Sequence, residues 1–292
     1  MRLGGEPESS NFEDRTGQSS SGFGGMGGGN ALGCLLPLVM SRFGLGGVVL
    51  LVVGYFVLNS LGGLGGTGGI LPSDKPQSAT PGQSTLSPDV ARFLRVILGD
   101  TEEYWGKALG NYRPTTMVAY TGGTQTACGF GQAAAGPFYC PNDQKIYIDP
   151  DFFNELARRF QAPGDFAMAY VIAHEVGHHI QNLQGTLDRA HQAQARAGET
   201  EGNAIQVRVE LQADCYAGVW AKNARNRQGQ PLLEPGDFEE GMRAAEAIGD
   251  DTLQKQSQGV VVPDSFTHGS SAQRMAALRR GYETGNPAAC TF

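Results

Sequence analysis

A short run of the chain, from His174 through Glu175 to His178, has the pattern H-E-x-x-H. On a helix, His174 and His178 would lie on one face about 5–6 Å apart at Cβ, a separation that one metal ion can bridge. Neutral imidazole is a good ligand for Zn2+. Glu175 would point in a different direction, so we expect it to be a general base that takes a proton from zinc-bound water and delivers it to the leaving amine.

A catalytic zinc ion usually has three protein ligands and keeps a fourth position for water, and two histidines with one glutamate are a common set. The best candidate for the third ligand is Glu210, which begins an E-x-x-x-D pattern that ends at Asp214. Asp214 would lie one turn further along the same face, where it could accept the outer ring N–H of a zinc-bound histidine and fix its tautomer. We therefore predict a Zn2+ site formed by His174, His178 and Glu210, with Asp214 supporting one histidine.

Histidines on helices are often only packing or surface residues, and a single H-E-x-x-H match is a moderate signal. The second pattern, at helical spacing, favours a zinc hydrolase. His179 is turned about 100° around the helix from His178, which indicates a structural or substrate-side residue. His191 lies in a polar stretch and is predicted to be an exposed helix residue.

Two helices must bring these residues together. Residues 165–184, bounded by Gly164 and Gly185, are predicted to form the first, and residues 202–226 the second. The other predicted helices are residues 87–110, 187–197, 237–248 and 271–282, and the predicted strands are residues 116–120, 124–128, 138–140 and 145–148. This order predicts an α+β fold with a small antiparallel or mixed sheet ahead of the active-site helices, the zincin arrangement. There, an edge strand at residues 124–128 or 136–140 would hold a peptide substrate.

Several blocks of the chain also resemble a known family. They are residues 10–15 (SNFEDR), 136–141 (GPFYCP), 169–179 (AYVIAHEVGHH), 210–215 (ELQADC) and 265–269 (SFTHG). Through them the chain resembles, nearly end to end, the bacterial "putative neutral zinc metallopeptidases" of the YpfJ type. That family is similar in its motifs to the gluzincin peptidases, in which the glutamate of E-x-x-x-D is the third zinc ligand. The resemblance implies a zinc peptidase.

His268 is a further candidate, because a metallopeptidase needs a donor beyond the metal to stabilise the oxyanion of the tetrahedral intermediate. Thr267 and His268, followed by Arg274, resemble a Thr-His-Pro…Arg segment of membrane-associated gluzincins, with Gly269 in place of the proline. We name His268 as a candidate catalytic residue. A helix-capping or solvated histidine is the alternative.

The first part of the chain has a different character. Residues 1–43 are rich in Gly and Ser and are predicted to be disordered. Residues 44–61 are apolar and uncharged, and because eighteen helical residues span about 27 Å, they are predicted to form one transmembrane helix. A buried core helix is the alternative. Residues 62–86, rich in Gly, Pro, Ser and Thr, are predicted to be a flexible linker, and residues 87–292 the zinc metallopeptidase domain.

Cysteines indicate the compartment. Cys128, Cys140, Cys215 and Cys290 lie in the globular part and allow three pairings, of which we favour Cys128 with Cys140 and Cys215 with Cys290. Disulfides persist in oxidising space, which predicts a single-pass cell-membrane protein with a cytoplasmic amino terminus and an extracytoplasmic catalytic domain. Four reduced thiols in a cytosolic domain are the alternative. The net charge of −7 and the lack of a basic patch argue against a nucleic-acid partner.

Together these features favour a membrane-anchored zinc endopeptidase that acts on a protein or peptide substrate. The competing hypothesis is a non-catalytic zinc-binding envelope protein that acts through protein–protein interaction. Glu175 favours the enzyme, because a structural zinc site is normally closed by a fourth side chain and needs no general base.

Overall fold

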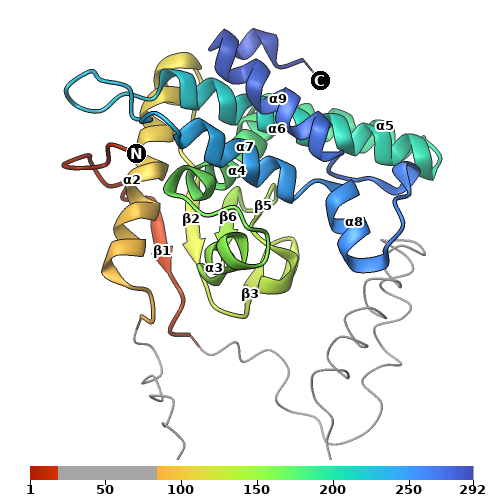
Figure 1. Ribbon diagram of the computed structural model, residues 1–292, viewed down its shortest axis with the longest axis horizontal. Helices are drawn as coiled ribbons and strands as arrows, with labels where there is room; N and C mark the ends of the chain where they lie inside the picture. The colour runs from red at the N-terminus through yellow and green to blue at the C-terminus, as the bar shows by residue number, and fades with distance from the viewer. Residues whose placement is uncertain (19–83, 292) are drawn as a thin grey trace, which may run out of the picture. The chain divides into compact units, whose positions relative to one another are not determined.

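The computed structural model describes residues 1–18 and 84–291, all within one compact unit. Its main sheet has the strand order β1-β2-β6-β5 (Figure 1). The described strands are β1 (Phe12–Asp14), β2 (Thr116–Ala119), β3 (Gly123–Thr126), β4 (Gly129–Gln132), β5 (Phe138–Cys140) and β6 (Lys145–Ile148). β1, β2 and β6 are parallel, β5 is antiparallel to β6, and β3 and β4 form a separate hairpin. The α+β class is confirmed, with a small mixed sheet.

The described helices are α2 (Pro88–Ala108), α3 (Asp151–Arg158), α4 (Asp165–Leu183), α5 (Thr186–Gln194), α6 (Glu199–Asn223), α7 (Asp237–Ala247), α8 (Asp250–Gln258) and α9 (Ser271–Thr284). Short 3-10 turns lie at η1 (Ala133–Ala135), η2 (Pro263–Ser265) and η3 (Pro287–Ala289). The Ser87 side chain accepts the Val90 N–H and Pro88 takes the first helical position, so α2 begins where its capping residues predict. α3, α8, β1 and β4 have no counterpart among the predicted elements.

Residues on the strands alternate between two faces of the sheet, as a period of two requires. Met117 and Ile146 belong to the main core together with side chains from α2, α4 and α6. Val118 and Tyr147 belong to a smaller cluster with Phe138. Because both faces of β2 and β6 are covered, these two strands are buried almost throughout.

The helices α4, α6, α7 and α9 pack against one another above the sheet in the view of Figure 1. The tightest approach joins α6 to α9 at Gly281. A Cβ atom placed there would lie 1.9 Å from the carbonyl oxygen of Cys215. Only a glycine therefore allows the two backbones to meet at this point.

The amino-terminal segment is structured, so the prediction of disorder over residues 1–43 is wrong for residues 1–18. Phe12 pairs with Met117 across β1 and β2. Glu102 on α2 accepts hydrogen bonds from Ser9 and Asn11, each at 2.9 Å. The Gly- and Ser-rich composition did not predict this strand, because a short segment without a core of its own can still add to the edge of an existing sheet.

Residues 19–83 lie outside the described part of the chain. They contain the predicted transmembrane segment at 44–61 and almost all of the predicted linker at 62–86. Within residues 1–18 and 84–291, no helix combines the length and the apolar character that crossing a bilayer requires.

Both favoured disulfides are confirmed. Cys128 and Cys140 are joined with a Cα–Cα distance of 5.8 Å, which ties the end of the β3–β4 hairpin to β5. Cys215 and Cys290 are joined with a Cα–Cα distance of 5.5 Å, which ties the carboxyl-terminal segment to α6.

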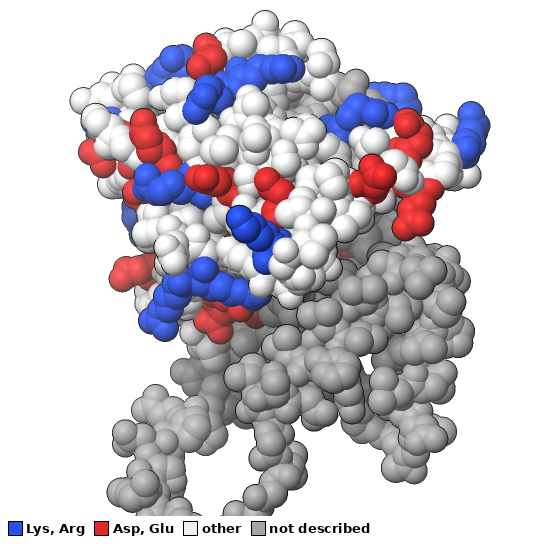
Figure 2. All heavy atoms as spheres, turned by 45° about the vertical axis from the view of Figure 1, so that its right-hand side comes forward, with Lys and Arg blue, Asp and Glu red and all other residues white. Residues whose placement is uncertain are grey.

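Charged side chains of both signs are interspersed on the coloured part of the face in Figure 2. Lys and Arg side chains lie next to Asp and Glu side chains and do not gather into one continuous patch there.

Candidate metal centre

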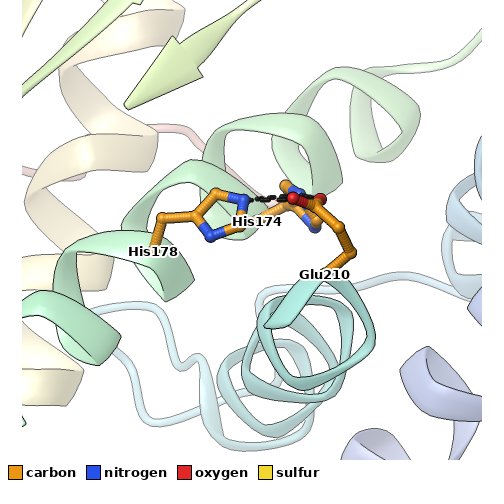
Figure 3. Close-up of side chains that lie close together, drawn as sticks. All are labelled: His174, His178 and Glu210. Carbon is orange, nitrogen blue, oxygen red and sulfur yellow. Dashed lines mark hydrogen bonds and ion pairs between the residues drawn. The ribbon is translucent and has the colours of Figure 1, made fainter. Parts of the chain in front are cut away.

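His174 and His178 project from α4 toward Glu210 on α6 (Figure 3). The two Nε2 atoms are 3.1 Å apart, and Glu210 Oε2 lies 3.1 Å from His174 Nε2 and 3.5 Å from His178 Nε2. The side chains of all three residues are largely shielded from solvent. The structure thus brings the three predicted ligands together.

This convergence depends on how closely α4 and α6 approach. Gly177, inside the H-E-x-x-H pattern, packs against Ala213 on α6. A Cβ atom on Gly177 would lie 2.9 Å from the Ala213 Cα atom and 3.0 Å from its carbonyl oxygen, so any larger residue would push the helices apart. Gly177 therefore permits the spacing at which a carboxylate of α6 reaches both histidines.

Hydrogen bonds fix the tautomers of the two histidines. His174 Nδ1 lies 2.7 Å from Asp214 Oδ1, and His178 Nδ1 lies 2.9 Å from Gln181 Oε1. Gln181 Nε2 donates to the Val209 carbonyl, so its oxygen is the end that faces His178. Both Nδ1 atoms must therefore be donors, which makes both Nε2 atoms acceptors in the neutral rings.

Three acceptor atoms thus face one another, and residues 1–18 and 84–291 place no donor between them. Such an arrangement is stabilised by a cation or by added protons. Two neutral imidazoles and one carboxylate fit Zn2+. Protons compete with zinc for these atoms. Burial by itself would lower the pKa of His174, but Asp214 and Glu210 raise that pKa to about 10. Binding of zinc would displace those protons.

Glu210 is held in its ionised form. Burial by itself would raise the pKa of Glu210. The charge of His178 and the hydrogen bonds with His174 and His178 outweigh burial and keep this pKa well below its usual range. Gln206, one turn earlier on α6, donates to Glu210 Oε1 at 2.9 Å. The other oxygen, Oε2, is left to face the histidines.

Asp214 makes the predicted contact with a histidine of the pair and also contacts a buried arginine. Arg274 on α9 donates from Nε and Nη2 to the two oxygens of Asp214, each at 2.9 Å, and Tyr170 donates to Oδ1 at 2.6 Å. Although burial opposes it, Arg274 and His174 lower the pKa of Asp214 to about 2. The carboxylate is therefore ionised and aimed at His174.

Glu175 lies outside this group of ligand atoms. It is buried, and among the described residues its Oε2 atom has no hydrogen-bond partner. Burial raises the pKa of Glu175 above its usual value, against the opposing charges of His178 and His174. A carboxylate with these properties suits a group that accepts and releases a proton.

His268 lies in the loop before α9, and its side chain is about half exposed. Asp250, the first residue of α8, accepts the backbone N–H groups of Thr267 and His268, and its other oxygen lies 3.3 Å from His268 Nδ1. Although burial opposes it, Asp250 and Glu210 raise the pKa of His268. The part of the chain that the structure describes shows no hydrogen bond from His268 to the three predicted ligands, so its catalytic role stays a prediction.

The remaining histidines have other positions. His179 is fully buried, and its Nε2–H donates to the Arg113 carbonyl at 2.6 Å, so its Nδ1 accepts from the Tyr139 hydroxyl at 3.0 Å. It thereby links α4 to β5, which agrees with the structural alternative. His191 is exposed on α5, as predicted.

Sequence reasoning missed three groups that orient the site. These are the Gln181 amide, the Tyr170 hydroxyl and the Gln206 amide. For Gln181 a signal existed, because it stands three residues after His178 on the same helical face. Tyr170 and Gln206 each stand four residues before a predicted site residue, a spacing too common to be informative by itself.

The family model described as "Putative neutral zinc metallopeptidase" matches residues 1–292 of the chain. An Escherichia coli K12 protein named "Uncharacterized protein YpfJ" is 45% identical over 301 residues, which cover 99% of this chain and 98% of that protein. A Mycobacterium tuberculosis H37Rv protein named "Uncharacterized protein Rv2575" is 42% identical over 243 residues, which cover 76% of this chain and 81% of that protein. No solved structure matches the chain significantly.

Proposed function

Because the chain belongs to the "putative neutral zinc metallopeptidase" family, we propose that it is a zinc-dependent endopeptidase with Glu175 as its general base. One observation carries this proposal. Two imidazole nitrogens and a carboxylate oxygen converge, and on the same helix as the imidazoles stands a buried carboxylate whose Oε2 atom finds no partner among the described residues. A purely structural zinc site would have no use for that unpartnered base.

Zinc, when bound, would polarise a water molecule and the scissile carbonyl, lowering the pKa of the water to about 7. Glu175 would take a proton from this water while the oxygen of the water bonds to the carbonyl carbon. Glu175 would then give the proton to the amide nitrogen as the C–N bond breaks. His268, whose ring nitrogen Nδ1 faces Asp250, is the candidate donor to the oxyanion.

β5 is the candidate strand for holding an extended substrate. Of the two segments considered, residues 124–128 overlap β3, which pairs with β4 in its own hairpin, whereas β5 is an edge of the main sheet. The Tyr139 hydroxyl connects β5 to α4 through His179 and Asn182. A peptide could therefore add to β5 as a further strand close to the metal-site helix.

The proposed setting is outside the cytoplasm and attached to the membrane. The two disulfides support an oxidising compartment, and residues 44–61 support attachment to a bilayer. The mixed charges in Figure 2 are in line with a partner other than nucleic acid.

We expect the purified full-length chain to bind one zinc ion and to cleave an unfolded protein. A chelator should stop cleavage, and added zinc should restore it. Metal analysis together with a gel assay of a denatured substrate would measure both. Zinc bound at full stoichiometry without hydrolysis of any unfolded substrate would contradict the peptidase and favour the non-catalytic envelope protein.

A further inference from the structure

We propose that Gln181 is a positioning residue for His178 and that the Cys215–Cys290 disulfide fixes its orientation through Gln212. The proposal rests on the zinc site argued above. It goes beyond that site by connecting one ligand to a cross-link at the carboxyl-terminal end of the described chain.

The side-chain amide of Gln181 is completely buried. Its oxygen accepts from His178 Nδ1 at 2.9 Å. Its nitrogen donates to the Val209 carbonyl at 2.7 Å and to Gln212 Oε1 at 3.0 Å. Rotation of this amide by half a turn would place a donor against the His178 N–H and an acceptor against two other acceptors, so only one orientation is stable.

The side-chain amide of Gln212, which donates no hydrogen bond to Gln181 but accepts one from it, is also buried. Because its oxygen accepts from Gln181, its nitrogen must find an acceptor on the other side. That acceptor is the Cys290 carbonyl at 2.8 Å. The disulfide with Cys215 holds this carbonyl against α6.

Each acceptor in the chain of hydrogen bonds from Cys290 to His178 therefore depends on the one before it. Breaking the disulfide would release the Cys290 carbonyl and allow the Gln212 amide to turn. The Gln181 amide would then lose one of the hydrogen bonds that keep its oxygen directed toward His178. A hydrogen bond that a zinc-binding histidine donates from its other ring N–H fixes the tautomer of the histidine and raises its basicity. The oxidation state of the disulfide is thus expected to influence the affinity for zinc.

We expect Gln181→Met, which is nearly equal in volume, to lower the zinc affinity of the full-length protein by about 10–100-fold. Gln212→Met and Cys290→Ser should lower it in the same direction by less. The Gln181→Met, Gln212→Met double variant should bind zinc no more weakly than Gln181→Met alone, since both changes break one chain. Competition with a chromophoric chelator would measure these affinities without any use of peptidase activity.

Asn223→Leu is the matched control. Asn223 lies on the same helix as Gln212 and donates to the Gly285 carbonyl at 3.0 Å. Its hydrogen-bond partners within the described residues do not include His178 or Gln181. It should change the midpoint of denaturant unfolding and leave zinc affinity unchanged. Wild-type affinity in Gln181→Met, or additive losses in the double variant, would overturn the relay, whereas failure of every variant and of the wild type to bind zinc would overturn the proposed function instead.

The two described segments of the chain, residues 1–18 and 84–291, also contact each other close to residues 18 and 84. Besides the β1–β2 pairing, Thr85 N–H donates to Thr16 Oγ1 at 3.0 Å, and the Ser84 hydroxyl donates to Asp14. Residues 1–18 and 84–291 therefore form one folded unit, and their adjoining ends are connected by hydrogen bonds.

Two strands that share backbone hydrogen bonds cannot lie on opposite sides of a bilayer. We infer that residues 1–18 and 84–291 occupy the same compartment, so that the chain between them crosses any membrane an even number of times or not at all. The single crossing that was expected from residues 44–61, with a cytoplasmic amino terminus, does not agree with this pairing. Attachment to a membrane is still compatible with it.

Epitope tags in the full-length protein would test the inference. Suitable positions are the turns at Gly5 and Gly229, which are exposed, have positive φ, and offer open space beside the backbone. We expect both tags to be reached by antibody on intact spheroplasts, or neither, and both after permeabilisation. One tag reached and the other protected before permeabilisation would overturn the shared compartment.

Discussion

Glu175→Gln is expected to remove hydrolysis almost completely while zinc stays bound. The amide is close to the carboxylate in size but cannot take a proton from water, and a positioned general base typically contributes about 10²–10⁴-fold to the rate. The ligand atoms His174 Nε2, His178 Nε2 and Glu210 Oε2 are unchanged. Measured kcat/KM should therefore fall by about that factor, with one zinc ion still present per chain.

Glu240→Gln provides a matched control for this substitution. Glu240 is a partly buried carboxylate that accepts the Phe166 N–H at the start of α4, and an amide oxygen can replace it in that role. Its kcat/KM should stay close to the wild-type value. If Glu175→Gln kept wild-type hydrolysis, the base would have to be another group, and if it lost zinc, Glu175 would have to be a ligand.

Glu210→Ala is expected to lose stoichiometric zinc. The change removes the one anionic atom among the three converging ligand atoms, and two imidazoles alone are an incomplete protein ligand set for a catalytic zinc. The loss of affinity should exceed the roughly 10–100-fold that supporting residues contribute. Chelator competition and metal analysis of the dialysed protein would measure it.

The zinc-dependent rise in melting temperature offers a second readout, because a ligand that binds only the folded state stabilises that state. Wild-type protein should show this rise and Glu210→Ala should not. Glu201→Ala, on an exposed part of the same helix, should behave like wild type. Full zinc occupancy in Glu210→Ala would show that another residue is the third ligand.

The local parts of this site were predictable from the sequence. His174 and His178 are one helical turn apart, as are Glu210 and Asp214, so a helix places each pair on one face wherever it packs. β5 and β6 were predicted with their observed bounds, since short apolar runs between turn residues mark strands well.

The parts that depend on distant contacts were not predictable. β1 has only three residues, and it forms because β2, more than ninety positions away, offers a free edge. α8 has the sequence DDTLQKQSQ, with one large apolar residue, so no amphipathic pattern reveals it. The pairing of Arg274 with Asp214 joins two helices that only the folded chain brings together.

The contact at Gly281 makes the electrostatics of the candidate metal centre sensitive to the size of a residue that touches none of its proposed ligands. α9 carries both Gly281 and Arg274, so a methyl group at position 281 would move the helix away from α6 and draw the guanidinium away from Asp214. The pKa of that carboxyl would then rise from about 2 toward its ordinary value, and its pull on the His174 ring would weaken. Natural variation at this glycine is thus expected to alter the affinity of the proposed site for zinc, although the H-E-x-x-H and E-x-x-x-D patterns themselves would be intact.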